Sequence, residues 1–214
     1  MPIKLNEREY RRIDVANLEA RTDDNDQKIV EGYATTFGQE YTLMDAGDYK
    51  VVESIDSRAF DETDMSDVIM QYDHQGRVFA RNKNGTLQLT VDDHGLKIRA
   101  DLGGTELGRQ LYEEIKGGYT DKMSFGFTVA KDQRTEERDE TKNQIVIHRL
   151  ITGIRRLFDV SAVSIPANDT TEISARSCGD GLIEAAREEY AAKLERQRKI
   201  KRIKILMEVE NDDH

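Results

Sequence analysis

The stretch KMSFGFTVA at residues 122–130 says most about the fold of this chain. Its large apolar residues alternate with small polar ones, a period typical of a strand with one buried face. Ser124 and Gly126 fall on the same, non-core face, and a serine beside a residue without a side chain leaves room for a substrate backbone. A half-exposed strand that turns small polar residues toward water explains the same pattern, so both interpretations stay open.

Similar runs of β-branched and aromatic residues fill the middle of the chain, separated by Gly, Asn and Asp. We expect strands at 30–37, 49–55, 68–72, 86–91, 96–100, 122–130, 144–150 and 156–165, with a hairpin turn at 92–95. Thr105 is a candidate N-cap for a helix with Leu107, Leu111 and Ile115 on one face, ended by glycines at 117–118. The expected fold class is α+β, mainly β, as a largely antiparallel sheet or barrel.

Composition divides the chain into a polar N-terminal segment (1–29), a central domain (30–177) and a helical charged tail (178–214). A low-complexity charged insert covers 131–143. The tail predicts a helix from about 181 to 207, with an apolar stripe of Ile183, Ala186, Tyr190 and Leu194 and many basic residues. Either it is a solvated helix, or it docks the protein to acidic scaffold, to DNA or to a second copy.

The overall composition excludes several classes of protein. With 214 residues, 32 Lys and Arg against 42 Asp and Glu, and a net charge of -10, a uniformly basic nucleic-acid binder is not expected. No stretch approaches the roughly 18–20 apolar residues of a membrane span, and the N-terminus has no apolar signal region. The lone Cys178 predicts no internal disulfide. The histidines lack metal-ligand spacing, so neither a metal nor a cofactor is expected, and the protein is expected to be soluble and intracellular.

Two further residues complete a candidate catalytic set with Ser124. His74 follows an expected strand and precedes a turn, and histidine is the usual general base for a serine; a simple surface histidine fits equally well. Asp159 lies in the most apolar strand, where a carboxylate needs a partner. That partner is either a histidine or one of the neighbours Arg155 and Arg156. The residue pattern alone does not bring the three groups together.

Four blocks in the chain have a familiar order: YDH at 72–74, DHGL at 93–96, GYTDKMSFGF at 118–127 and FDVSAVSIPAN at 158–168. In this order they resemble the prohead proteases of tailed phages. The resemblance covers about residues 30–170 and implies a herpesvirus-protease-like β-barrel flanked by helices. It also implies a serine endopeptidase that works inside the assembling prohead in the host cytoplasm. There it would cut the scaffold segment of the major capsid protein and itself.

Carried over residue by residue, the resemblance makes Ser124 the nucleophile and His74 the catalytic histidine. The family usually has Glu as third member, whereas this chain has Asp159, which is one methylene shorter. His148 is the rival, because herpesvirus-type enzymes use a second histidine.

The same likeness points to the loop of Arg155 and Arg156 for the oxyanion hole, to substrate room at Gly126, and to self-association as a dimer or higher oligomer. The alternative function is a non-catalytic capsid-assembly or scaffolding protein that retains the fold.

Overall fold

The computed structural model describes residues 7–13, 18–22, 27–164 and 169–212, with side chains given outside 12–13, 169–174 and 204–212. Two α-helices, one short 3-10 helix and eleven strands make up the described chain. The elements in chain order are β1 (Glu9–Ile13), β2 (Glu19–Thr22), β3 (Lys28–Thr36), β4 (Tyr41–Asp45), β5 (Tyr49–Ile55), β6 (Ile69–Tyr72), β7 (Gln75–Arg81), η1 (Asn82–Asn84), β8 (Leu87–Val91), β9 (Gly95–Asp101), α1 (Glu106–Lys116), β10 (Lys122–Asp139), β11 (Gln144–Val163) and α2 (Asp169–Asp212).

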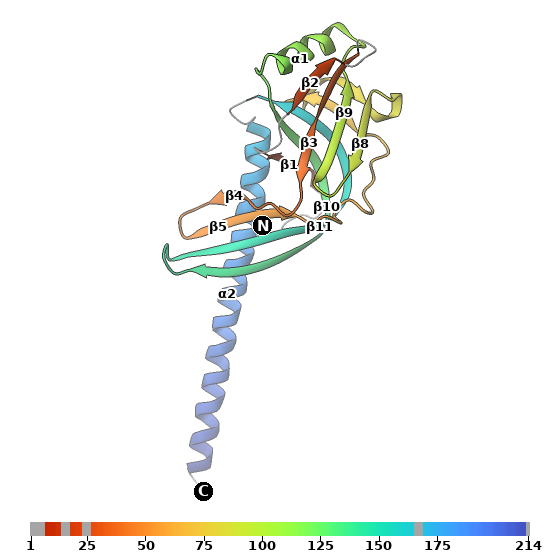
Figure 1. Cartoon of the computed structure of the whole chain (residues 1–214). Coiled ribbons are helices and arrows are strands. Elements are labelled where there is room, and N and C mark those ends of the chain that lie inside the picture. The colour runs from red at the N-terminus through yellow and green to blue at the C-terminus, as the bar shows by residue number, and fades with distance from the viewer. Residues whose placement is uncertain (1–6, 14–17, 23–26, 165–168, 213–214) are drawn as a thin grey trace.

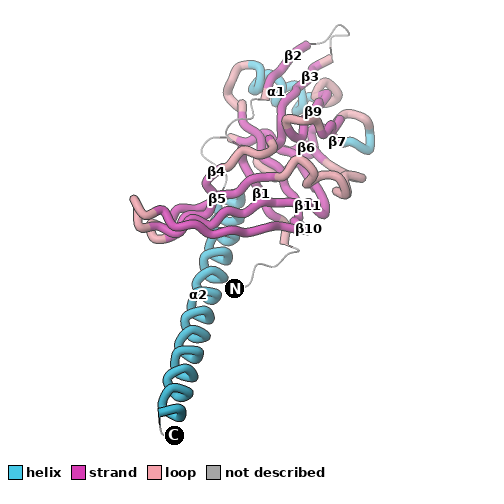
Figure 2. The backbone as a smooth tube through the Cα atoms, turned by 60° about the horizontal axis from the view of Figure 1, so that its bottom comes forward, coloured by secondary structure: helices cyan, strands magenta, loops and turns pink. Residues whose placement is uncertain are grey.

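The strands form two sheets packed around one apolar core (Figures 1 and 2). The larger sheet has the order β1-β10-β11-β5-β4, with β6 paired to β11 and β7 to β6; the smaller has the order β2-β3-β9-β8. Pairing is antiparallel except where β11 meets β5 and β6. The mainly β, α+β prediction is confirmed. The barrel is not, because the described strands make two separate sheets and no closed ring.

The charged insert at 131–143 is not a loop. β10 continues through it to Asp139 and pairs with the first half of β11, so the expected strands at 144–150 and 156–165 are parts of one strand. Most side chains of this β10 extension are charged and exposed. The sequence therefore lacks the apolar alternation from which a strand could have been predicted there. Asn143, with φ of 51°, lies at the turn that reverses the ribbon.

Helix α1 confirms the predicted cap, because the Thr105 hydroxyl accepts a hydrogen bond of 2.9 Å from the Gly108 N–H. Its expected core face is wrong in one position. Leu107 is 38% exposed, whereas Tyr112 is buried with Leu111 and Ile115. The core therefore lies about one residue further round the helix than the simple i, i+4 spacing suggested.

Helix α2 starts earlier than predicted and leaves the body as one long straight rod (Figure 1). Gly179 lies inside the helix, where a Cβ would come within 2.8 Å of Met44 on β4. Of the predicted stripe, Ile183 and Ala186 are buried in a small cluster with Val51 and Ile147, whereas Tyr190 and Leu194 are exposed.

The expected domain limits do not coincide with breaks in the fold. The limit after residue 29 falls inside β3, and the limit after 177 falls inside α2. The polar N-terminal segment supplies β1 and β2, one to each sheet. In the described part of the chain, no helix is long and apolar enough to cross a membrane.

Candidate active site

Three neighbouring strands bring the candidate residues to one place. Ser124 on β10 lies opposite Ser161 on β11, and Gly126 lies opposite Asp159. β6 runs parallel to β11 with Tyr72 opposite Ala162, so the turn after β6 reaches the same end of the sheet. His74 is the second residue of that turn.

The turn that carries His74 has an uncommon backbone. Asp73 and His74 have φ of 49° and 57°, and Tyr72 pairs with Gln75 across them. Two successive positive φ values make the tight hairpin turn that matches strand twist, although Asn and Gly usually fill it. Asp73 accepts hydrogen bonds from the backbone N–H and the hydroxyl of Ser164, at 3.0 and 2.8 Å, which fix the strained turn.

Ser124, His74 and Asp159 form a continuous line of contacts. Nε2 of His74 lies 2.5 Å from Oγ of Ser124, and Nδ1 lies 2.5 Å from Oδ1 of Asp159. With Nδ1–H donating to the carboxylate, Nε2 is left to accept the serine proton. This is the arrangement that nucleophilic catalysis by a serine requires.

The carboxylate of Asp159 is held from three sides. Its Oδ1 also accepts a hydrogen bond of 2.9 Å from the hydroxyl of Ser161, and Arg8 forms an ion pair with its Oδ2. Burial by itself would raise the pKa of Asp159, but His74, Arg8 and Ser161 together hold that pKa below its usual value. The side chain is therefore ionised at neutral pH, as an orienting acid must be.

The register of β10 and β11 shifts next to Gly126, where one extra residue of β11 is inserted as a bulge. A Cβ at this position would lie 2.3 Å from Oδ2 of Asp159. The space above the glycine is filled by Asp159, Tyr10 and Arg8. In this conformation the glycine makes room for the carboxylate, and its predicted role toward substrate remains a prediction.

The expected open face around the serine is wrong. Ser124 and Asp159 are 0% exposed, and the His74 side chain is 1% exposed. The ring of Tyr10 packs on the imidazole with 4.5 Å between centroids, and Arg8 lies over Phe158 beside Asp159. Both covering residues come from β1 or the residue just before it.

His148 lies elsewhere on β11. It faces Glu40 and Glu137, at 2.8 and 3.2 Å, and no described contact joins it to His74. Burial lowers the pKa of His148, but the two carboxylates outweigh this effect and raise it.

The two candidate oxyanion arginines are also separate from Ser124. Arg156 stacks on Phe158 at 5.1 Å and lies 3.6 Å from Asp64, whereas Arg155 is exposed. Arg155 lines a surface hollow of about 560 Å³, which none of the three candidate catalytic residues lines. Arg156 thus borders the site through Phe158, and Arg155 does not.

Three residues of the site were missed from the sequence: Arg8, Tyr10 and Ser161. Ser161 carried a usable signal, because it lies two positions from Asp159 and so shares its face of the strand. Arg8 and Tyr10 stand in a short charged segment far from the other residues in sequence, and nothing local connects them to the site.

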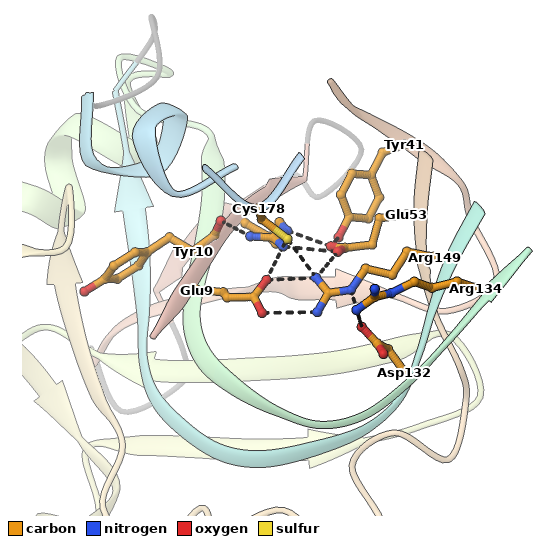
Figure 3. Close-up of polar contacts among 9 residues, drawn as sticks. Glu9, Tyr10, Tyr41, Glu53, Asp132, Arg134, Arg149 and Cys178 are labelled. Carbon is orange, nitrogen blue, oxygen red and sulfur yellow. Dashed lines mark hydrogen bonds and ion pairs between the residues drawn. The ribbon is translucent and has the colours of Figure 1, made fainter. Parts of the chain in front are cut away.

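A second cluster of buried charges lies on the opposite face of β1 (Figure 3). Glu9, Glu53 and Cys178 have donor atoms within 4.8 Å of one another, which is a spacing that could hold a metal ion. The carboxylates are already paired with Arg11 and Arg149, however. Burial raises the pKa of the Cys178 thiol to about 11. In the part of the chain that the structure describes, the carboxylates of this cluster form an ion-pair network with the two arginines.

Comparison with known proteins identifies the family. Residues 16–182, which include all three candidate catalytic residues, match the family described as caudovirus prohead serine protease. The chain belongs to this family. It is also 30% identical over 162 residues to the prohead protease of Enterobacteria phage HK97. That match covers 75% of this chain and 65% of the HK97 protein. No solved structure matches the chain significantly. The resemblance inferred from the sequence motifs is confirmed.

Proposed function

We propose that this prohead protease family member is a serine endopeptidase in which Ser124 is the nucleophile, His74 the general base and Asp159 the orienting acid. The observation that carries the proposal is the unbroken line of contacts, with 2.5 Å from Ser124 Oγ to His74 Nε2 and 2.5 Å from His74 Nδ1 to Asp159 Oδ1. Hydrogen-bond reach between nucleophile and base, with the base oriented by a third group, is the geometric signature of this chemistry.

In the reaction, Ser124 Oγ attacks the carbonyl carbon of the scissile peptide while His74 Nε2 takes its proton. His74 then gives this proton to the leaving amine, and water repeats the sequence to release the acyl group. Asp159 keeps the imidazole in the tautomer with hydrogen on Nδ1 and stabilises the imidazolium. Backbone N–H groups that reach the substrate carbonyl are the proposed oxyanion donors, each worth on the order of 3 kcal/mol.

Membership of the prohead protease family supports a proposal for the substrates. We assign to the enzyme the scaffold segment of the major capsid protein, cleaved inside the assembling prohead in the host cytoplasm, and the protease chain itself. The exposed, Lys- and Arg-rich stretch of α2 at 193–202 suits docking to acidic scaffold or association with another copy.

The decisive experiment compares the wild-type chain with Ser124→Ala, incubated with assembled capsid protein that carries its scaffold segment. Wild type should shorten the capsid protein and itself, whereas the variant should leave both intact with an unchanged melting temperature. Retained cleavage by Ser124→Ala would remove this serine from the mechanism.

The burial of all three residues is the observation that favours the alternative, a capsid-assembly protein that keeps the fold without activity. A serine-reactive fluorophosphonate separates the two functions. An enzyme acquires the label at Ser124, and wild type that stays unlabelled in proheads as well as in free solution would favour the assembly role.

A further inference from the structure

A substrate cannot reach the serine in this conformation. Ser124 and Asp159 are 0% exposed and the His74 side chain is 1% exposed, whereas attack on a peptide needs contact with its carbonyl carbon. The ring of Tyr10 covers the imidazole of His74, and Arg8 forms an ion pair with Oδ2 of Asp159. The segment that must move therefore includes β1 and Arg8 just before it, because Tyr10 and Arg8 are the covering residues.

Strand β1 lies where an extended peptide would cross the nucleophile. It is the terminal strand of the larger sheet and pairs antiparallel with β10, with the backbone of Arg12 opposite Ser124 and Tyr10 opposite Gly126. Without β1, the edge of β10 that carries Ser124 would be free. An exposed sheet edge is a common docking site for an extended peptide, which adds to it as one more strand.

Building on the proposed function, we infer that the β10 edge beside Ser124 binds the substrate as an antiparallel strand, and that β1 occupies this edge as an intramolecular competitor. Substrate cleavage then requires exchange of one strand for the other. The family match supports the separate role of β1, since it begins at residue 16, after β1, and includes Ser124, His74 and Asp159.

The way β1 is attached makes exchange feasible. The described side chains of β1 contact the body through ion pairs of Glu9 with Arg149 and of Arg11 with Glu53, and through the ring of Tyr10 on His74. Glu9 pairs with Arg11 within β1, while Arg149 pairs with Glu53 on the body (Figure 3). Separation therefore leaves an ion pair on each side instead of stranding a single buried charge, which would be the most unfavourable result.

The same network predicts which side chains a substrate strand presents. Residues at the places of Glu9 and Arg11 face Arg149 and Glu53, which lie 2.9 Å from Glu9 and 2.6 Å from Arg11 respectively. A negative charge is favoured opposite Arg149, and a positive charge is favoured opposite Glu53. The edge therefore prefers an acidic residue followed two positions later by a basic one, because alternate residues of a strand share a face.

The test measures how fast a fluorophosphonate labels Ser124 in three full-length proteins. These are wild type, Arg8→Ala/Tyr10→Ala, and the control Arg21→Ala/Tyr33→Ala. The control is matched because Arg21 pairs with Glu31 and the Tyr33 ring packs on His94 at 4.6 Å, both on the other sheet.

Loosening β1 should raise the labelling rate of the first variant by about tenfold, while the control stays within about threefold of wild type. Equal rates in the two variants would overturn the strand inference and leave the serine assignment standing. No label at Ser124 in any of the three proteins would refute the serine assignment, and the inference with it.

A peptide competition tests the charge preference directly. The synthetic peptide EREYRRI, residues 7–13, should slow labelling of Arg8→Ala/Tyr10→Ala, whereas the same peptide with Glu9→Arg and Arg11→Glu should not. Equal inhibition by the two peptides, or none by either, would overturn the proposed recognition.

Discussion

Replacing Gly126 by alanine should disable the site while leaving the fold in place. The new Cβ would lie 2.3 Å from Oδ2 of Asp159, compared with 3.4 Å where ordinary contact begins. The carboxylate must then move by about 1.1 Å, the difference between these distances. Tyr10 and Arg8 also approach the new atom, at 2.9 and 3.0 Å, but they belong to the mobile side of the proposed exchange.

The displaced carboxylate has nowhere to go without losing a partner. Asp159 is 0% exposed, and its Oδ1 holds both His74 at 2.5 Å and Ser161 at 2.9 Å. Both oxygens belong to one rigid group, so a shift of Oδ2 moves Oδ1 as well. A misplacement of about 1 Å typically lowers the rate by roughly 100-fold, and we expect a loss of at least about that size in kcat.

The assay is the initial rate of cleavage of a peptide from the scaffold segment, with the melting temperature measured on the same samples. Gly153→Ala is the matched control. Gly153 is also a strand glycine, and a Cβ there would lie 3.4 Å from the Cβ of Lys131, an ordinary contact. The control should stay within about threefold of wild type. A Gly126→Ala enzyme equally close to wild type would refute the role given to Asp159.

Three further predictions concern the third catalytic residue, acid stability and the tail. Asp159→Asn should lower kcat by about 1,000-fold or more while His148→Ala has little effect; peptide-cleavage rates that show the reverse would move the third role to His148. Arg11 and Arg149 outweigh burial and lower the pKa of Glu9 to about 2, so its contribution to stability is lost as pH falls below its ordinary value of 4.5. Denaturant unfolding should therefore show about 2 kcal/mol less stability at pH 3 than at pH 6 from this residue, a loss that Glu9→Gln removes and Glu136→Gln on the exposed ribbon does not. Truncation after Glu188, beyond the buried part of α2, should preserve peptide cleavage but reduce incorporation into proheads; incorporation at the wild-type level would reject the docking role of the tail.

Elements with a strong local pattern could be predicted from the sequence. The cap at Thr105 and the hairpin at 92–95 are set by residues close to one another, and both are observed. The extension of β10 that pairs with the first half of β11 was not predicted as a strand, because it is charged on both faces and has no apolar period. The early start of α2 was not predicted, and the close approach of Gly179 to Met44 within it is a tertiary contact that no local rule reveals.

The site divides in the same way. Ser124 stood out because it shares the small-residue face of its strand with Gly126, Asp159 because it is a carboxylate in the most apolar strand, and His74 because it preceded a turn. Arg11 and Arg149 gave no such signal. Each is almost completely buried, 2% and 1% exposed, although arginine is normally a surface residue. Arg11 pairs with Glu53, 42 residues away along the chain, and Arg149 pairs with Glu9, 140 residues away, so only the assembled structure reveals the network.

The contact between Asp159 and His74 is explained by the local backbone. An aspartate side chain is short, so the backbone must carry its carboxylate close to the histidine. Two features accomplish this: the bulge of β11 opposite Gly126, and the absence of a side chain on that glycine. The positive φ at His74 brings the imidazole from the other side. The positions of Asp159, Gly126 and the strained turn therefore depend on one another. A change in any of the three should alter the contact between His74 and Ser124.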